Sequence, residues 1–249
     1  MDVHRRRKAL SRRAQPGVIV VVGAGGRVGC SLLAIAIARE CARTAESNVV
    51  LVDADRFGGG LDVLLGHEQL PGARWPDVAM AGAGVPFIEV QAALPATGES
   101  YGLLSMDRRD AVVDEVFVDG FFDDAQCEAT VVVDVSRDWS SPVAVAAFQR
   151  ADLLITTITT HVRSCASALR LLQQPIFAEA PPKECLAVVR EVSHGASMRS
   201  IKRGLPMPVA ARVPHVRRLN RLGESGVPGA VIPRGLALAA RSVLAHAGV

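Results

Sequence analysis

The residues best suited by type and spacing to chemistry are a glycine-rich run and the aspartates that end two apolar stretches. The run GGRVGCS, residues 25–31, follows the apolar stretch 18–22 and precedes a second apolar segment. A strand, a glycine-rich loop and a helix N-terminus together present backbone N–H groups and a partial positive charge to an anion. The sequence therefore predicts a phosphate-binding loop here.

This loop departs from the phosphate-loop pattern G-x-x-x-x-G-K-[ST] at two positions. Gly29 and Ser31 match the second glycine and the metal-holding hydroxyl, but Ala24 replaces the first glycine and Cys30 replaces the lysine. A thiol is mostly neutral at pH 7 and does not substitute for an ammonium group between phosphates. The loop is expected to keep its backbone donors and to lack its main cation.

Asp53, Asp55 and Asp134 are the candidate acidic site residues. Asp53 ends the apolar run 48–53, Asp55 follows it, and Asp134 stands near the end of the run 129–135. Carboxylates at the carboxyl ends of parallel strands lie where open α/β sheets bind ligands. The alternative for Asp55 is that it only opens the loop that contains the glycines 58–60.

The elements that would position these residues form an α/β pattern. Continuous apolar runs are typical of parallel strands that are covered on both faces. Buried strands are predicted at 18–22, 48–53, 129–135, 152–158 and 185–190, with a strand at 101–106, an edge strand at 207–213, and helices at 32–42, 162–173 and 236–246. A helix at 111–117 and a surface position for the acid-rich stretch 114–124 are also expected. The sequence predicts a three-layer fold, a mostly parallel sheet with helices on both faces.

Composition favours one domain over residues 17–249, preceded by a disordered basic arm at 1–16. The chain is 49% apolar, yet residues 1–16 carry a net charge of +5 and residues 192–223 carry +7. Five cysteines without a C-x-x-C pair favour reduced thiols, and no apolar run approaches the ~20 residues of a membrane span. These features predict a cytoplasmic protein.

The order of these motifs resembles the deviant phosphate-loop (P-loop) ATPases of the MinD/ParA class, over roughly residues 17–245. Within that class it is most similar to the CpaE-like septum-site-determining proteins (Ssd), in which a small residue commonly replaces the loop lysine. The class loop reads roughly K-G-G-x-G-K-[ST], so both lysines are missing here and Arg27 takes the place of a glycine. Further matching blocks lie at residues 51–66, 71–79, 131–137 and 151–170.

The resemblance implies a P-loop NTPase fold that takes ATP and magnesium, bound weakly or not at all. It places the phosphates over Gly25, Gly26, Arg27, Val28, Gly29, Cys30, Ser31 and Leu32, and the metal at Ser31, Asp53 and Asp134. Asp55 would orient the attacking water if the protein hydrolyses ATP at all. Losing one charge-assisted phosphate contact costs about 1.5–3 kcal/mol, or about 10- to 150-fold in affinity.

The resemblance also implies a regulatory or localisation role in septum-site determination and cell division, with partners in the division machinery. Two alternatives remain: a weak magnesium-dependent ATPase homodimer that positions a Tad-type pilus or secretion apparatus, and a ParA-like module that binds DNA without sequence preference. The basic segments 5–13 and 199–221 are candidates for contact with anionic lipid at the inner face of the membrane or with DNA. The segment 199–221 could instead form a basic rim that contacts an acidic partner, and an ordinary solvated surface is the alternative for both segments.

Overall fold

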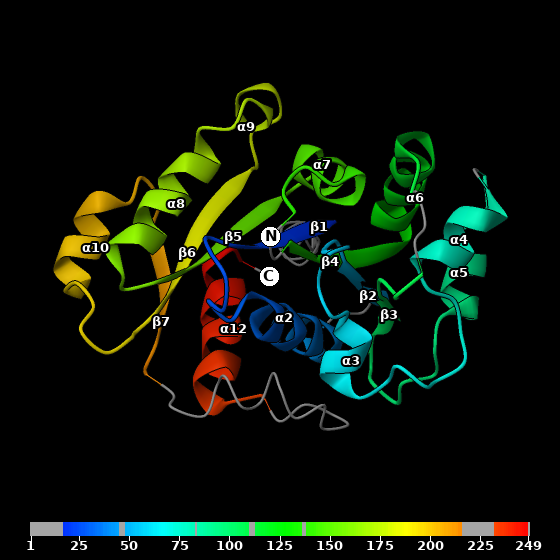
Figure 1. Ribbon diagram of the computed structural model, residues 1–249, viewed down its shortest axis with the longest axis horizontal. Coiled ribbons are helices and arrows are strands. Elements are labelled where there is room, and N and C mark those ends of the chain that lie inside the picture. Colours follow the sequence, from blue (N-terminus) through cyan, green and yellow to red (C-terminus); the bar gives the residue numbers. More distant parts are fainter. Residues whose placement is uncertain are drawn as a thin grey trace, which may run out of the picture.

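The computed structural model describes residues 17–44, 48–82, 84–109, 113–135, 138–215 and 232–248. These residues form three layers, with a seven-stranded sheet between two layers of helices (Figure 1). The strand order is β3-β2-β4-β1-β5-β6-β7, and every neighbouring pair is parallel. The predicted fold class is confirmed.

The strands follow the apolar runs of the sequence. Their bounds are β1 Val18–Gly23, β2 Asn48–Asp53, β3 Gly102–Leu104, β4 Ala129–Val135, β5 Leu153–Thr159, β6 Glu184–Arg190 and β7 Val209–Val213. The central strands β1, β4 and β5 are buried along their whole length because helices cover both faces. β7 lies at the edge of the sheet, as predicted from the prolines beside it.

Ten helices of the described residues cover the two faces. They are α2 Cys30–Thr44, α3 Leu61–Leu65, α4 Trp75–Ala81, α5 Phe87–Ala93, α6 Glu115–Glu128, α7 Pro142–Gln149, α8 Val162–Leu172, α9 Ile176–Glu179, α10 Met198–Gly204 and α12 Arg234–His246. α2, α3 and α12 pack on one face of the sheet, and α4 to α10 pack on the other. The strands thus run with their carboxyl ends toward one edge, between the two helical layers.

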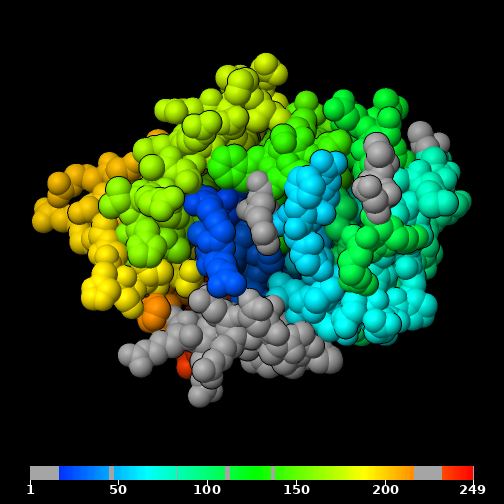
Figure 2. All heavy atoms as spheres, in the orientation of Figure 1, coloured from blue at the N-terminus to red at the C-terminus, as the bar shows by residue number. Residues whose placement is uncertain are grey.

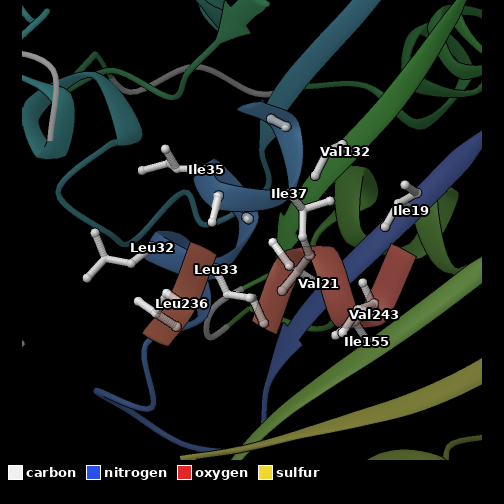
Figure 3. Close-up of a cluster of buried hydrophobic side chains, with 14 of the residues drawn as sticks. Ile19, Val21, Leu32, Leu33, Ile35, Ile37, Val132, Ile155, Leu236 and Val243 are labelled. Carbon is white, nitrogen blue, oxygen red and sulfur yellow. The ribbon is translucent and has the colours of Figure 1, made fainter. Parts of the chain in front are cut away.

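The core on the α2 side consists of aliphatic side chains from α2, α12 and alternate strand positions. Ile19 and Val21 of β1 point toward these helices, whereas Val18, Val20 and Val22 point to the other layer. Figure 3 shows Leu33 and Ile37 of α2 and Val243 of α12 gathered over β1, β4 and β5. The helix predicted at 236–246 is present as α12, and its apolar side packs into this core.

The region between β3 and β4 differs from the sequence prediction. A helix was expected at 111–117 and a surface position for the acid-rich stretch 114–124. In the structure residues 115–124 belong to α6, which begins at Glu115 and extends to Glu128. Phe117, Phe121 and Phe122 are buried, and Trp75 meets Phe121 edge-on at 5.2 Å between ring centroids. In the sequence the acidic residues of α6 alternate with apolar ones, which hides the helical spacing of the apolar residues. In the helix the apolar residues share the buried face and the acidic residues face solvent.

Several predicted features lie outside the described residues. These are the basic arm 1–16, residues 111–112 and the part of the basic segment from 216 to 221. Among the helices of the described residues, none combines the length and the apolar character that crossing a membrane requires.

Candidate functional site

The loop between β1 and α2 turns sharply over residues 24–29. Gly25 and Gly29 adopt φ angles of +132° and +92°, and Arg27 takes a φ of +58°, in the left-handed region that favours glycine. The Leu33 N–H donates to the Gly29 carbonyl at 3.1 Å, which starts the hydrogen bonding of α2. Figure 2 shows this loop, in blue, at the surface between the yellow-green region of α8 and the cyan segment that follows β2.

Cys30, at the loop's lysine position, points inward. Its Sγ lies 3.3 Å from the Val21 carbonyl oxygen and 3.1 Å from Oδ1 of Asp134, and the residue is 5% exposed. The thiol therefore sits between the loop and the carboxyl ends of β1 and β4, and it donates to a carboxylate that an ammonium group would neutralise.

The structure brings the predicted carboxylates together. Asp53 and Asp134 are directly opposite each other in the β2–β4 ladder, and both are almost fully buried. Asp55, also buried, follows two residues later, and its backbone N–H donates to Oδ1 of Asp53 at 3.0 Å. The loop after β1 reaches the same group through the contact between Cys30 and Asp134.

Asp53 is hydrogen-bonded to the segment that follows β2 and to Ser105. Its Oδ2 accepts hydrogen bonds from the Leu61 N–H at 2.9 Å and from the Ser105 hydroxyl at 3.3 Å. Burial and the neighbouring Asp134 carboxylate raise the pKa of Asp53 to about 7. Two adjacent buried carboxylates repel each other when both are ionised. A cation bound beside them would reduce this repulsion.

A second polar group beside Asp53 was not anticipated from the sequence. Asp62, at the start of α3, pairs with Arg74 at 3.2 Å, and Ser105 Oγ lies 3.3 Å from Oδ1 of Asp62. Arg74 also donates to the carbonyls of Gly72 and His67. The only sequence signal was a charged pair inside apolar segments, LDVLLG and PGARWP. The network fixes the connection from α3 to α4 against β3.

The carboxylates at the strand ends are the candidates for holding magnesium. Among the described residues, no group of three or more His, Cys, Asp or Glu side chains is placed to hold a metal. Magnesium usually takes one or two carboxylates, keeps several waters and completes its shell with substrate phosphates. The motif indicates Asp134 and Ser31 for that role. In the structure Oδ1 of Asp134 accepts from Cys30, and both oxygens of Asp53 accept hydrogen bonds from the backbone.

On the other side of the loop, Arg190 at the end of β6 reaches the backbone. Its Nε donates to the Val28 carbonyl at 3.1 Å and its Nη2 to the Arg27 carbonyl at 2.7 Å. Arg190 is not among the site residues predicted from the sequence. In the structure Arg190 donates hydrogen bonds to two consecutive loop carbonyls, although it lies 162 residues from Val28 in the sequence. These hydrogen bonds help to fix the conformation of the loop.

A pocket of about 630 Å³ lies beside this contact. It is bounded by the loop residues 24–28, by the junction of β5 and α8 and by the end of β6. It includes four residues of the predicted phosphate seat, Gly25 to Val28, whereas Gly29 to Leu32 and the three aspartates are not part of its lining.

The described part of the basic segment 199–221 places cations on α10 and β7. Arg199, Lys202 and Arg203 are exposed on α10, while Arg212 of β7 pairs with Glu191 at 2.6 Å. Arg217, Arg218 and Arg221 lie outside the described residues.

Comparison with known sequences gives a mycobacterial relative. No protein-family model matches the chain. An uncharacterized protein present in two strains of Mycobacterium tuberculosis is 33% identical over 231 residues, which cover 92% of this chain. The chain spans 61% of the length of that relative.

Comparison with solved structures shows the fold. A ParA family ATPase from Chlorobium tepidum matches with a TM-score of 0.76 at 18% identity, over 92% of this chain and 96% of its own. MinD from Aquifex aeolicus in a complex with MinC matches at 0.70 and 19%, over 91% and 96%. MinD from Pyrococcus horikoshii in a complex with Mg-ADP matches at 0.68 and 12%, over 90% and 93%. The chain has the fold of MinD and ParA ATPases.

Proposed function

We propose that the protein is a MinD/CpaE-like regulatory or localisation protein of septum-site determination and cell division, with weak or no ATP hydrolysis. The observation that carries this proposal is the buried contact between Cys30 and Asp134. A neutral thiol occupies the position from which the phosphate-loop lysine reaches the β- and γ-phosphates. Since that charge is absent, the loop is better suited to regulation by contact than to turnover.

ATP and magnesium, where they bind, would use the residues that the motif indicates. The backbone N–H groups of residues 25–32 would face the phosphates, and Ser31 and Asp134 would hold the metal, with Asp53 behind them. Bound magnesium would offset phosphate charge. Asp55 is the candidate for orienting water, because its backbone N–H is held by Asp53 beside the other two carboxylates.

Equilibrium dialysis with ATP and magnesium tests this account of the site. We expect a dissociation constant that is about 10- to 150-fold weaker than that of a Cys30→Lys variant. The control is Cys30→Ser, which stays neutral and should bind ATP as the wild type does. If wild type and Cys30→Lys bind ATP equally, the thiol is not what limits the site.

The positioning role is tested separately in the cell. A fluorescent fusion of the chain is expected to concentrate at the division site or at another fixed position, through protein partners of the division machinery. An even distribution through the cytoplasm would contradict the proposal, and a distribution that follows the nucleoid would favour DNA binding instead.

A weak magnesium-dependent ATPase homodimer in pilus or secretion positioning is the second candidate, favoured by the clustered Asp53 and Asp134. Its signature is turnover that Asp55→Ala abolishes. MinD of Aquifex aeolicus is known in a complex with MinC, which supports the expectation that this chain also has protein partners.

A ParA-like DNA-binding module is the third candidate, favoured by the exposed cations of α10. Binding to random duplex DNA that weakens steeply with salt and is abolished by charge reversal at Arg217 and Arg218 would support it. Contact of the segments 5–13 and 199–221 with anionic lipid at the inner face of the membrane is the corresponding proposal for localisation, and vesicles with and without anionic lipid distinguish the two.

A further inference from the structure

The outward face of α6 is acidic and has few partners. The helix contains no Lys or Arg, and its acidic residues are Glu115, Asp119, Asp123, Asp124 and Glu128. Arg150 pairs with Asp119 and Asp123, both at 2.8 Å. The other three carboxylates are exposed, and within the described part of the chain none of them forms an ion pair. This face therefore keeps a net negative charge.

The same face begins with an exposed apolar side chain. Val116 is 72% exposed, and around Gly120, one turn later, a Cβ would meet nothing within 4 Å. Asp123 and Asp124 follow in the next turn, so these residues lie along one side of the helix, because residues three and four apart are neighbours on a helix surface. The face thus offers an apolar end, an open middle and an acidic end.

The basic arm, residues 1–16, joins the described chain beside this helix. Gly17 packs against the last turn of α6, where a Cβ on Gly17 would lie 3.4 Å from the Cβ of Gln126. The Val131 N–H donates to the Gly17 carbonyl at 2.8 Å, which fixes the point of attachment at the start of the sheet. The arm is therefore tethered at the acidic end of α6.

The arm has the length and the side chains to follow this face. The 14 residues of α6 rise about 21 Å, whereas 16 extended residues span up to about 55 Å. The arm carries a net charge of +5, with basic runs at 5–8 and 12–13 on either side of Ala9 and Leu10. Its basic–apolar–basic order complements a helix face that is both acidic and apolar.

We propose that the arm, residues 1–16, docks along the outward face of α6. Arg12 and Arg13, which are close to the attachment point, pair with the carboxylates of the last two turns, and Leu10 covers Val116. Exposed ion pairs are individually weak, but the tether makes docking intramolecular, so several weak contacts act together. The proposal does not depend on the positioning role proposed above.

A disulfide probe on the full chain tests the proposal. Cys127 is exposed at the end of α6, and Ser11→Cys places a second thiol in the arm. In a glutathione redox buffer, the equilibrium between the free thiols and their disulfide gives the effective concentration of one thiol at the other, and peptide mapping identifies the pair. A free short tether gives a value in the millimolar range, and we expect docking to raise it by about tenfold or more at low salt.

Charge reversals in the Ser11→Cys chain then locate the contact. Asp124→Lys should lower the effective concentration by about threefold or more, because it replaces attraction to the arm by repulsion. The matched control is Glu179→Lys, the same charge change at an exposed position on α9, which should change it by less than about twofold because solvent screens it. Adding Arg12→Glu and Arg13→Glu to Asp124→Lys should recover most of the loss.

Four outcomes would overturn the proposal. They are an effective concentration no higher than that of a free tether, equal losses in Asp124→Lys and Glu179→Lys, no recovery on the charge swap, and no decrease when ionic strength rises from about 0.01 M to 1 M. The substituted positions on the helices are exposed, so these variants are expected to fold. None of these results bears on where the protein localises in the cell, so the two proposals fail separately.

Discussion

The Sγ of Cys30 lies 3.1 Å from Oδ1 of Asp134, at the point where the loop after β1 meets the carboxyl end of β4. Both residues are buried, so this contact is formed inside the protein and not in solvent. A thiol donates one weak hydrogen bond there, whereas a lysine would bring a full positive charge. At this position the motif's cation is therefore replaced by a thiol.

The first prediction concerns Cys30→Lys. The new ammonium group would meet Asp134 and the Val21 carbonyl, and it would restore a cation under the loop. ATP affinity in the presence of magnesium should rise by about 10- to 150-fold, as measured by equilibrium dialysis beside the neutral Cys30→Ser variant. An ATP affinity equal to that of the wild type would show that another residue, such as Arg27, blocks the phosphate-binding loop.

The second prediction concerns the buried ion pair between Asp62 and Arg74. Arg74→Met leaves the carboxylate of Asp62 buried without its cation, and it should lower the free energy of unfolding by about 3–5 kcal/mol in urea denaturation. The control is Arg109→Ala, which breaks an exposed pair with Asp77. The control should unfold at nearly the wild-type urea concentration, and a similar loss in both variants would contradict the role of burial.

The third prediction concerns α6. Phe121→Ala removes a ring that packs against Trp75, Phe87 and Phe122, and it should cost about 3–5 kcal/mol of stability. The control is Val116→Ala, on the exposed side of the same helix. Urea denaturation that does not separate the two variants would mean that 114–124 lies at the surface after all.

The fourth prediction concerns pH. The pKa of Asp53 in the folded chain, about 7, lies above its ordinary value of 3.8, so the folded state binds the proton more tightly than the unfolded state. The stability that Asp53 contributes is therefore fully present below about pH 4 and is lost as pH rises through 7. Urea denaturation from pH 4 to 8 should show wild type losing stability relative to Asp53→Asn, whereas parallel curves would contradict the raised pKa.

The strands could be predicted from the sequence because parallel strands covered on both faces must be continuously apolar. This is why 18–22 and 129–135 were recognised without any tertiary information. α6 was mistaken because its acidic residues lie between its phenylalanines in sequence, and only the helical period separates them in space.

The candidate site could be predicted only where residues close together in the sequence form a recognisable motif. The glycine-rich loop, Ser31 and Asp134 follow from a motif and from strand ends. The contact of Arg190 with the Val28 carbonyl and the pairing of Asp62 with Arg74 depend on how distant segments pack, and composition gives no sign of either. The sequence therefore indicated the carboxylate side of the loop and missed the pocket on the Arg190 side.

The release of phosphate from ATP by the purified chain, with magnesium and at saturating ATP, tests the central claim most directly. We expect a rate at or only slightly above the background without protein, because the cation that the motif requires is replaced by the Cys30 thiol. Turnover at ordinary enzymatic rates, about 1 per second or faster, that is abolished by Asp55→Ala would contradict the claim.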